Sequence, residues 1–149
     1  MRDFRKLLVF PKAHSLALFV YRSTRLLPRQ ERFGLAQQMR GCARSIPANL
    51  VEGCGRRTRH DLAHFIDMSI GSANELLYYS MLCRDLEYLP PDVCQEIERR
   101  VTEVIRMLVA LARAIRTRPG LGDRPEPPTT RAATPTDPHA LRTPPRRNG

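Results

Sequence analysis

The feature that most constrains the fold of this chain is the spacing of its apolar residues, which repeats with the helical period in four segments. The segments run from Pro11 to Leu27, from Gln30 to Cys54, from Thr58 to Leu86 and from Pro90 to beyond Ile115. Connections of only a few residues make successive helices antiparallel, and no alternating strand pattern competes. The spacing therefore predicts an all-α, antiparallel, up-down-up-down four-helix bundle.

Local signals mark the ends of these helices. Gly53 and Gly55 are typical of a helix C-terminus, because glycine readily adopts the left-handed conformation found there. Thr58 and Asp61 form a capping-box pattern at the start of the third helix. Pro47 lies inside the second segment and predicts a kink in that helix.

The composition changes after the fourth segment. Residues 118–149 contain eight of the 13 prolines, and Leu121 and Leu141 are their only large apolar side chains. Such a segment buries too little apolar surface to offset the entropy of ordering it. We therefore expect a folded domain over residues 1–117 and a disordered C-terminal tail over residues 118–149.

The charge of the chain favours an anionic partner. The formal net charge is +10, and all but two of the 25 basic residues are arginine, whose planar fork suits phosphate. The alternative is a GC-rich genome, whose codon usage favours arginine, so that the arginine content has no functional cause. The candidate nucleic-acid-binding residues are Arg56, Arg57 and Arg59, beside the N-terminus of the third helix, together with Arg40 and Arg44 on the second. No aromatic residues interleave with them, so the expected contacts to RNA or DNA are to phosphates.

Polar residues on the second and third helices predict a hydrogen-bonded network between them. Ser45, Asn49 and Glu52 are spaced four and three residues apart and so share one face of the second helix. Ser72 and Glu75, three apart on the third helix, are expected to meet them, with Gln38 as a further member. We favour a structural role, because polar groups inside a bundle must satisfy one another. The weaker alternative is a hydrolase site built from Glu52, Glu75 and nearby histidines.

Metal, cofactor and membrane roles are not expected. His60 and His64 lie one helical turn apart, but the sequence supplies no clear third ligand. The four cysteines show no CxxC spacing, which favours free thiols in a reducing cytoplasm. The chain opens without a signal-peptide pattern, and no apolar run is long enough to span a membrane.

The third helix is apolar on two faces, which predicts self-association. In a four-helix bundle each helix keeps an outer face, so a second apolar stripe needs another partner. The candidate interface residues are Phe19 on the first helix and Ile66, Ile70, Leu77 and Met81 on the third.

The combined motifs resemble a known bacterial family. They include Lys12-Ala13-His14, Phe33-Gly34-Leu35, Gln38, Arg40, Ser45 to Asn49, Glu52-Gly53, Arg56, Asp61, Phe65, Gly71-Ser72, Glu75-Leu76 and Asp85. Over about residues 4–117 the chain resembles the four-helix bundle proteins often encoded in intervening sequences of 23S ribosomal RNA genes. It departs from their pattern in having Phe10-Pro11 before the Lys-Ala pair and in its proline-rich tail.

The resemblance implies a homopentamer with no enzymatic activity. A related member, the accessory protein of diversity-generating retroelements, binds nucleic acid and partners a reverse transcriptase. We therefore expect a non-enzymatic scaffold that binds RNA or DNA, with a reverse transcriptase or another protein as a further partner. The alternative is a purely structural self-assembling protein with no nucleic-acid role, and a metal-dependent hydrolase is the weakest hypothesis.

Overall fold

The computed structural model describes residues 2–118, which form four α-helices. Helix α1 spans Val9–Ser23, α2 spans Leu35–Gly55, α3 spans Arg59–Asp85 and α4 spans Pro91–Thr117. Three short 3-10 helices also occur, η1 at Phe4–Lys6, η2 at Thr24–Leu26 and η3 at Arg29–Glu31. The predicted all-α antiparallel bundle is confirmed. The predicted tail, residues 118–149, lies outside the described residues apart from Arg118.

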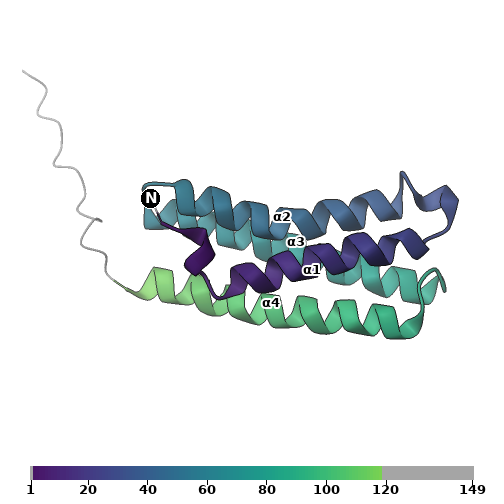
Figure 1. Cartoon of the computed structure of the whole chain (residues 1–149). Coiled ribbons are helices and arrows are strands. Elements are labelled where there is room, and N and C mark those ends of the chain that lie inside the picture. Colours follow the sequence, from purple (N-terminus) through teal and green to yellow (C-terminus); the bar gives the residue numbers. More distant parts are fainter. Residues whose placement is uncertain (1, 119–149) are drawn as a thin grey trace, which may run out of the picture.

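Each helix packs against two neighbours around one core. Helix α2 lies between α1 and α3, and α4 closes the bundle against α3 and α1 (Figure 1). The core consists of side chains with less than 2% exposure from all four helices, among them Leu16, Met39, Leu50, Leu76 and Leu108. This burial of the periodic apolar stripes is the main force that stabilises the bundle.

Two helix boundaries differ from the sequence expectation. Helix α1 ends at Ser23 and is followed by η2. Helix α2 begins only at Leu35, because Gly34 has a non-helical backbone and the Glu31 carboxylate accepts the Leu35 N–H at 3.0 Å. An expected single helix from Gln30 is therefore a 3-10 turn followed by a capped α-helix. Helix α2 then continues through Pro47 to Gly55.

Helices α2 and α3 approach closely near the turn that joins them. Thr58 Oγ1 accepts the Asp61 N–H at 3.0 Å, which confirms the predicted cap of α3. Further along, Ser69 Oγ donates to the carbonyl of Ile46 at 2.9 Å, and both residues are fully buried. This bond ties the middle of α3 to the backbone of α2.

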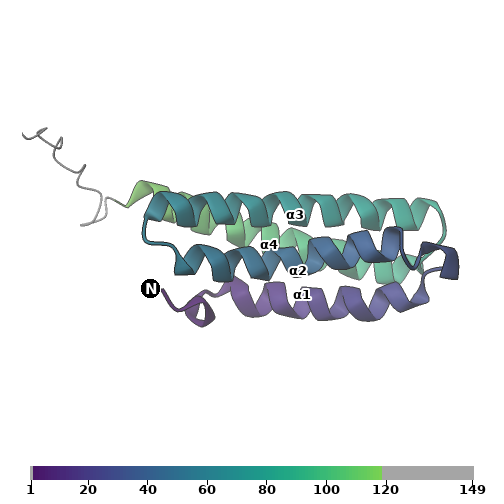
Figure 2. The same cartoon turned by 90° about the horizontal axis from the view of Figure 1, so that it is seen from above.

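The antiparallel topology gathers distant parts of the chain at one end of the bundle. The N-terminal segment, the α2–α3 turn and the C-terminus of α4 all lie at that end, as two views at right angles show (Figures 1 and 2). Within residues 2–118, no helix combines the length and the hydropathy needed to cross a membrane.

Candidate nucleic-acid interface

Basic residues concentrate at the end of the bundle that carries the α2–α3 turn. We call this the basic end and define it by nine residues: Arg2, Arg5, Lys6, Arg56, Arg57, Arg59, Arg113, Arg116 and Arg118. The acids in the same regions are Asp3, Glu52, Asp61 and Asp67. Eight of these nine basic residues lie within residues 1–117, so with the four acids they contribute +4 to the net +7 of that range (19 basic and 12 acidic residues).

The predicted arginines of the α2–α3 turn differ in how tightly the fold holds them. Arg56 forms an ion pair with Glu52 and lies over the ring of Phe65, 5.0 Å from its centroid. Arg59 donates to the carbonyl of Ile115 at 2.8 Å, which satisfies a backbone group near the C-terminus of α4. Arg57 is exposed, and its side chain has no hydrogen bond or ion pair within residues 2–118. Arg57 is thus the most available phosphate ligand of the three.

The structure does not bring Arg40 and Arg44 to the basic end. Arg40 Nε donates to Thr24 Oγ1 at 2.8 Å, and its guanidinium lies over the Tyr21 ring. Arg44 Nη1 donates to the hydroxyl of Tyr21 at 3.4 Å. Because Arg44 precedes Gly55, the last residue of α2, by eleven residues, it lies about 16 Å along the axis from that end of the helix. Arg40 and Arg44 thus join α2 to α1 and η2 away from the basic end, and their role in binding nucleic acid stays a prediction.

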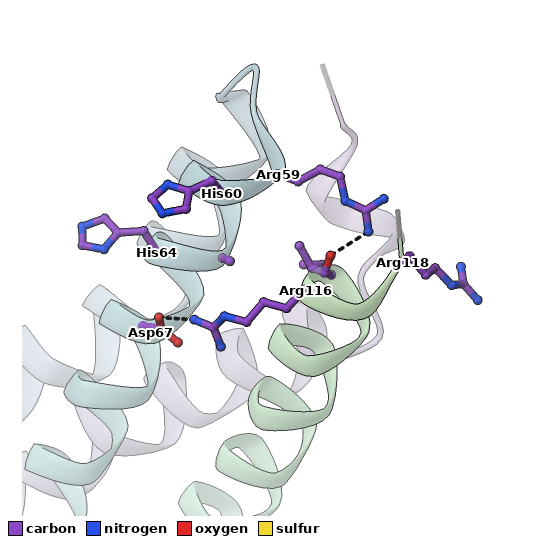
Figure 3. A pocket seen from close by; sticks show the side chains of 8 residues that line it. Arg59, His60, His64, Asp67, Arg116 and Arg118 are labelled. Atoms are coloured by element: carbon purple, nitrogen blue, oxygen red, sulfur yellow. Dashed lines mark hydrogen bonds and ion pairs between the residues drawn. The ribbon is translucent and has the colours of Figure 1, made fainter. Parts of the chain in front are cut away.

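A groove of about 350 Å³ opens at the basic end between the start of α3 and the end of α4. Arg59 and Arg116 reach across it from opposite sides, Arg59 toward α4 and Arg116 toward Asp67 on α3 (Figure 3). His60 and His64 contribute from α3, and Arg118 from the end of α4. The groove is therefore lined mainly by cationic and nitrogen-donor side chains.

Sequence reasoning missed six residues of the basic end: Arg2, Arg5, Lys6, Arg113, Arg116 and Arg118. They lie far from the α2–α3 turn in the chain, and no pattern within their own segments marks them as nucleic-acid-binding residues. The available signal was the topology itself, because an up-down-up-down bundle places the chain start, the second connection and the end of the fourth helix together.

Part of the predicted polar network exists between α2 and α3. Asn49 Nδ2 and Ser72 Oγ both donate to Ser45 Oγ, at 3.1 and 3.0 Å. All three side chains are half-buried. Ser45 is the centre of this small cluster, which links the two helices.

The other predicted members of the network lie elsewhere. Glu52 pairs with Arg56 one turn along α2, and Gln38 is exposed. Glu75 is exposed and accepts a hydrogen bond from the Tyr79 hydroxyl at 3.1 Å. Burial, reinforced by the neighbouring Glu75 carboxylate, raises the pKa of the Cys42 thiol to about 12. The six polar residues therefore do not form one network, and only Ser45, Asn49 and Ser72 are joined to one another.

The residues of the hydrolase hypothesis do not converge. Glu75 follows His64 by eleven residues on α3, a separation of about 16 Å along the helix axis. Within residues 2–118, no group of three or more His, Cys, Asp or Glu side chains is arranged to hold a metal ion. His60 and His64 instead line the groove beside arginines.

The predicted interface residues occupy different environments in the monomer. Ile66 is fully buried in the core and cannot contact another copy, so its assignment is wrong. Ile66 faces the core because the buried face of α3 includes Ser69 and Ser80, which apolar spacing does not mark. Phe19 is half-buried, as are Ile70 and Leu77, while Met81 is 42% exposed.

Comparisons with known proteins agree with this architecture. A crystal structure of a protein of unknown function from the S23 ribosomal protein family of Bacteroides thetaiotaomicron is similar, with a TM-score of 0.67 and 22% sequence identity. The match covers 71% of this chain and 96% of that one, and at this identity it shows the shared fold alone. No curated protein matches the chain in sequence. Residues 5–110 match the family model described as 23S rRNA-intervening sequence protein, and the chain therefore belongs to that family.

Proposed function

We propose that this protein is a non-enzymatic, homo-oligomeric scaffold that binds RNA or DNA through phosphate contacts at its basic end. The observation that carries the proposal is the concentration of nine basic side chains from three separate parts of the chain at that end. Such a surface attracts polyanions and favours weakly sequence-selective binding. A reverse transcriptase is the protein partner that the resemblance suggests.

Salt dependence tests the nucleic-acid proposal. Fluorescence anisotropy with labelled single-stranded RNA and duplex DNA, from 50 to about 400 mM KCl, should give a linear fall of log affinity with log salt. Removing one phosphate contact should lower the slope by about 0.7–0.9. We expect this result for Arg57→Ala, whose side chain has no intramolecular bond to lose within the described residues.

Arg106→Ala is the matched control for this experiment. Arg106 is exposed in the middle of α4, away from the basic end, and its substitution removes the same formal charge. An absence of binding at 50 mM salt would refute the proposal. Equal weakening by the two variants would show that net charge alone, and not the basic end, attracts the nucleic acid.

The homo-oligomer is supported by apolar side chains on the outer side of the α3–α4 pair. Val109 is 43% exposed and lines a shallow hollow with Ile70, while Met81 and the half-buried Leu77 continue the same stripe of α3. The same surface favours the second candidate, a purely structural self-assembling protein. We expect light scattering to give an oligomeric mass, a pentamer by the resemblance, and Val109→Lys to lower it. A monomeric wild type would refute self-association, and an oligomer without nucleic-acid affinity would favour the second candidate.

A further inference from the structure

We infer that the groove between the start of α3 and the end of α4 is a phosphate-binding site, and that Asp67 lowers its affinity by holding Arg116. The inference rests on the proposed function and deepens it, because it assigns a particular site to the phosphate contacts. The ligand class is a phosphate group, carried by a nucleic acid or free in solution.

The two bridging arginines carry the first part of the inference. An arginine side chain has five N–H donors, and Arg59 uses Nη2 on the Ile115 carbonyl. Arg116 likewise uses Nη2 on Asp67. Each guanidinium is therefore held at the groove by one bond while most of its donors stay available (Figure 3). The Arg59 donors, held by a backbone carbonyl, bind an anion with little further loss of side-chain entropy. Arg116 must first exchange its bond to Asp67 for one to the anion.

The remaining lining of the groove also suits an anion. His60 and His64 lie one turn apart on α3 and border the groove, and Arg118 borders it from the end of α4. Their side chains project outward from the space between Arg59 and Arg116 (Figure 3). The positive dipole end of α3 and the negative dipole end of α4 both adjoin the groove and oppose one another, so its side chains decide the sign of its charge. Asp67 is the one acidic residue of the lining within the described chain.

Asp67 opposes phosphate in two ways. Its carboxylate occupies Nη2 of Arg116, and its negative charge repels an incoming anion. Because both partners of this ion pair are about half exposed, the pair is weak and a stronger ligand can displace it. Phosphate binding should therefore compete with Asp67 for Arg116.

Inorganic phosphate is the direct probe of this site. We would titrate it into the full chain at pH 7.5 and constant ionic strength, following the imidazole resonances of the histidines by NMR. The expected result is a saturable shift of His60 and His64. His14 on α1 should not shift, because it does not line the groove. No saturable shift, or equal shifts at His14, His60 and His64, would overturn the inference.

Two substitutions test the roles of the charged residues. Arg116→Gln should weaken phosphate binding about tenfold, since charge-assisted hydrogen bonds are lost. Asp67→Asn keeps the side-chain shape and should tighten binding about two- to fivefold, as expected for releasing an exposed ion pair. Unchanged or weaker binding by Asp67→Asn would refute the role assigned to Asp67. Circular dichroism would verify that both variants stay folded.

The anisotropy experiment separates this inference from the proposed function. RNA binding that falls in Arg57→Ala but is unaffected by Arg116→Gln and Asp67→Asn would leave the basic end intact as the interface and refute the groove. Saturable phosphate binding in the groove without any RNA or DNA affinity would support the groove and refute the proposed function.

Discussion

Replacing Gly53 by alanine tests how closely α2 and α3 pack. A Cβ at this position would lie 2.9 Å from Phe65 Cβ and 3.0 Å from Leu62 Cδ1, whereas carbon atoms pack best at about 3.5–4.0 Å. The helices must separate by roughly 0.5–1 Å to admit the methyl group, and overpacking of this kind costs about 1–3 kcal/mol. Alanine recovers up to about 1 kcal/mol in helix propensity. We expect a net loss of about 0.5–2 kcal/mol in the free energy of unfolding.

Thermal unfolding at fixed protomer concentration measures this effect, since oligomer stability depends on concentration. For a folded region of this size the expected fall in Tm is roughly 2–8 °C. Gly41→Ala is the control within the same helix, because its Cβ would meet no atom within 4 Å. It should raise the free energy of unfolding by up to about 1 kcal/mol. A Gly53→Ala variant stabilised as much as Gly41→Ala would refute the close packing of the two helices.

Three further predictions concern stability. Leu50→Ala should cost about 2–5 kcal/mol in denaturant unfolding, because Leu50 is fully buried; a loss below 1 kcal/mol would contradict its place in the core. Glu87→Gly should raise the free energy of unfolding by up to about 1 kcal/mol, since Glu87 adopts the left-handed backbone conformation with φ 58°, and destabilisation would speak against that conformation. Burial raises the pKa of both Cys42 and Cys83 from 9.0 to about 12, so the unfolded chain loses these protons first and stability should fall as pH rises from about 9 to about 12. Urea titrations across this range should show a shallower fall in Cys83→Ala, and an identical fall would refute the contribution of that thiol.

Local sequence signals predicted a helix boundary well where the capping residue lies directly beside the helix in the sequence. Thr58 satisfies an N–H of its own helix, and the capping pattern placed the start of α3 correctly. The start of α2 was misplaced because the deciding contact, from the Glu31 carboxylate to the Leu35 N–H, spans a turn that breaks the periodic pattern. Periodicity identifies a helix more reliably than it identifies the helix end.

The candidate site was only partly predictable. Arg57 was identified from its neighbours in sequence, and it lies exposed at the basic end. Arg40 and Arg44 have the same side chain and a similar local context, yet contacts with Tyr21 and Thr24 on another part of the chain engage them. Whether an arginine is available to bind a phosphate depends on the residues that contact it in the folded protein, and local sequence does not specify those residues.

By itself, the sequence determined the four-helix architecture and its antiparallel order. Apolar spacing decides which face each helix buries, and the short α2–α3 and α3–α4 connections make these helices antiparallel. Only the tertiary structure decided which polar residues meet. It placed Arg116 against Asp67, buried Ile66 and joined Ser45 to Ser72, because these contacts depend on the register and rotation of packed helices. Side-chain packing between helices sets those quantities, and residues far apart in the chain supply it.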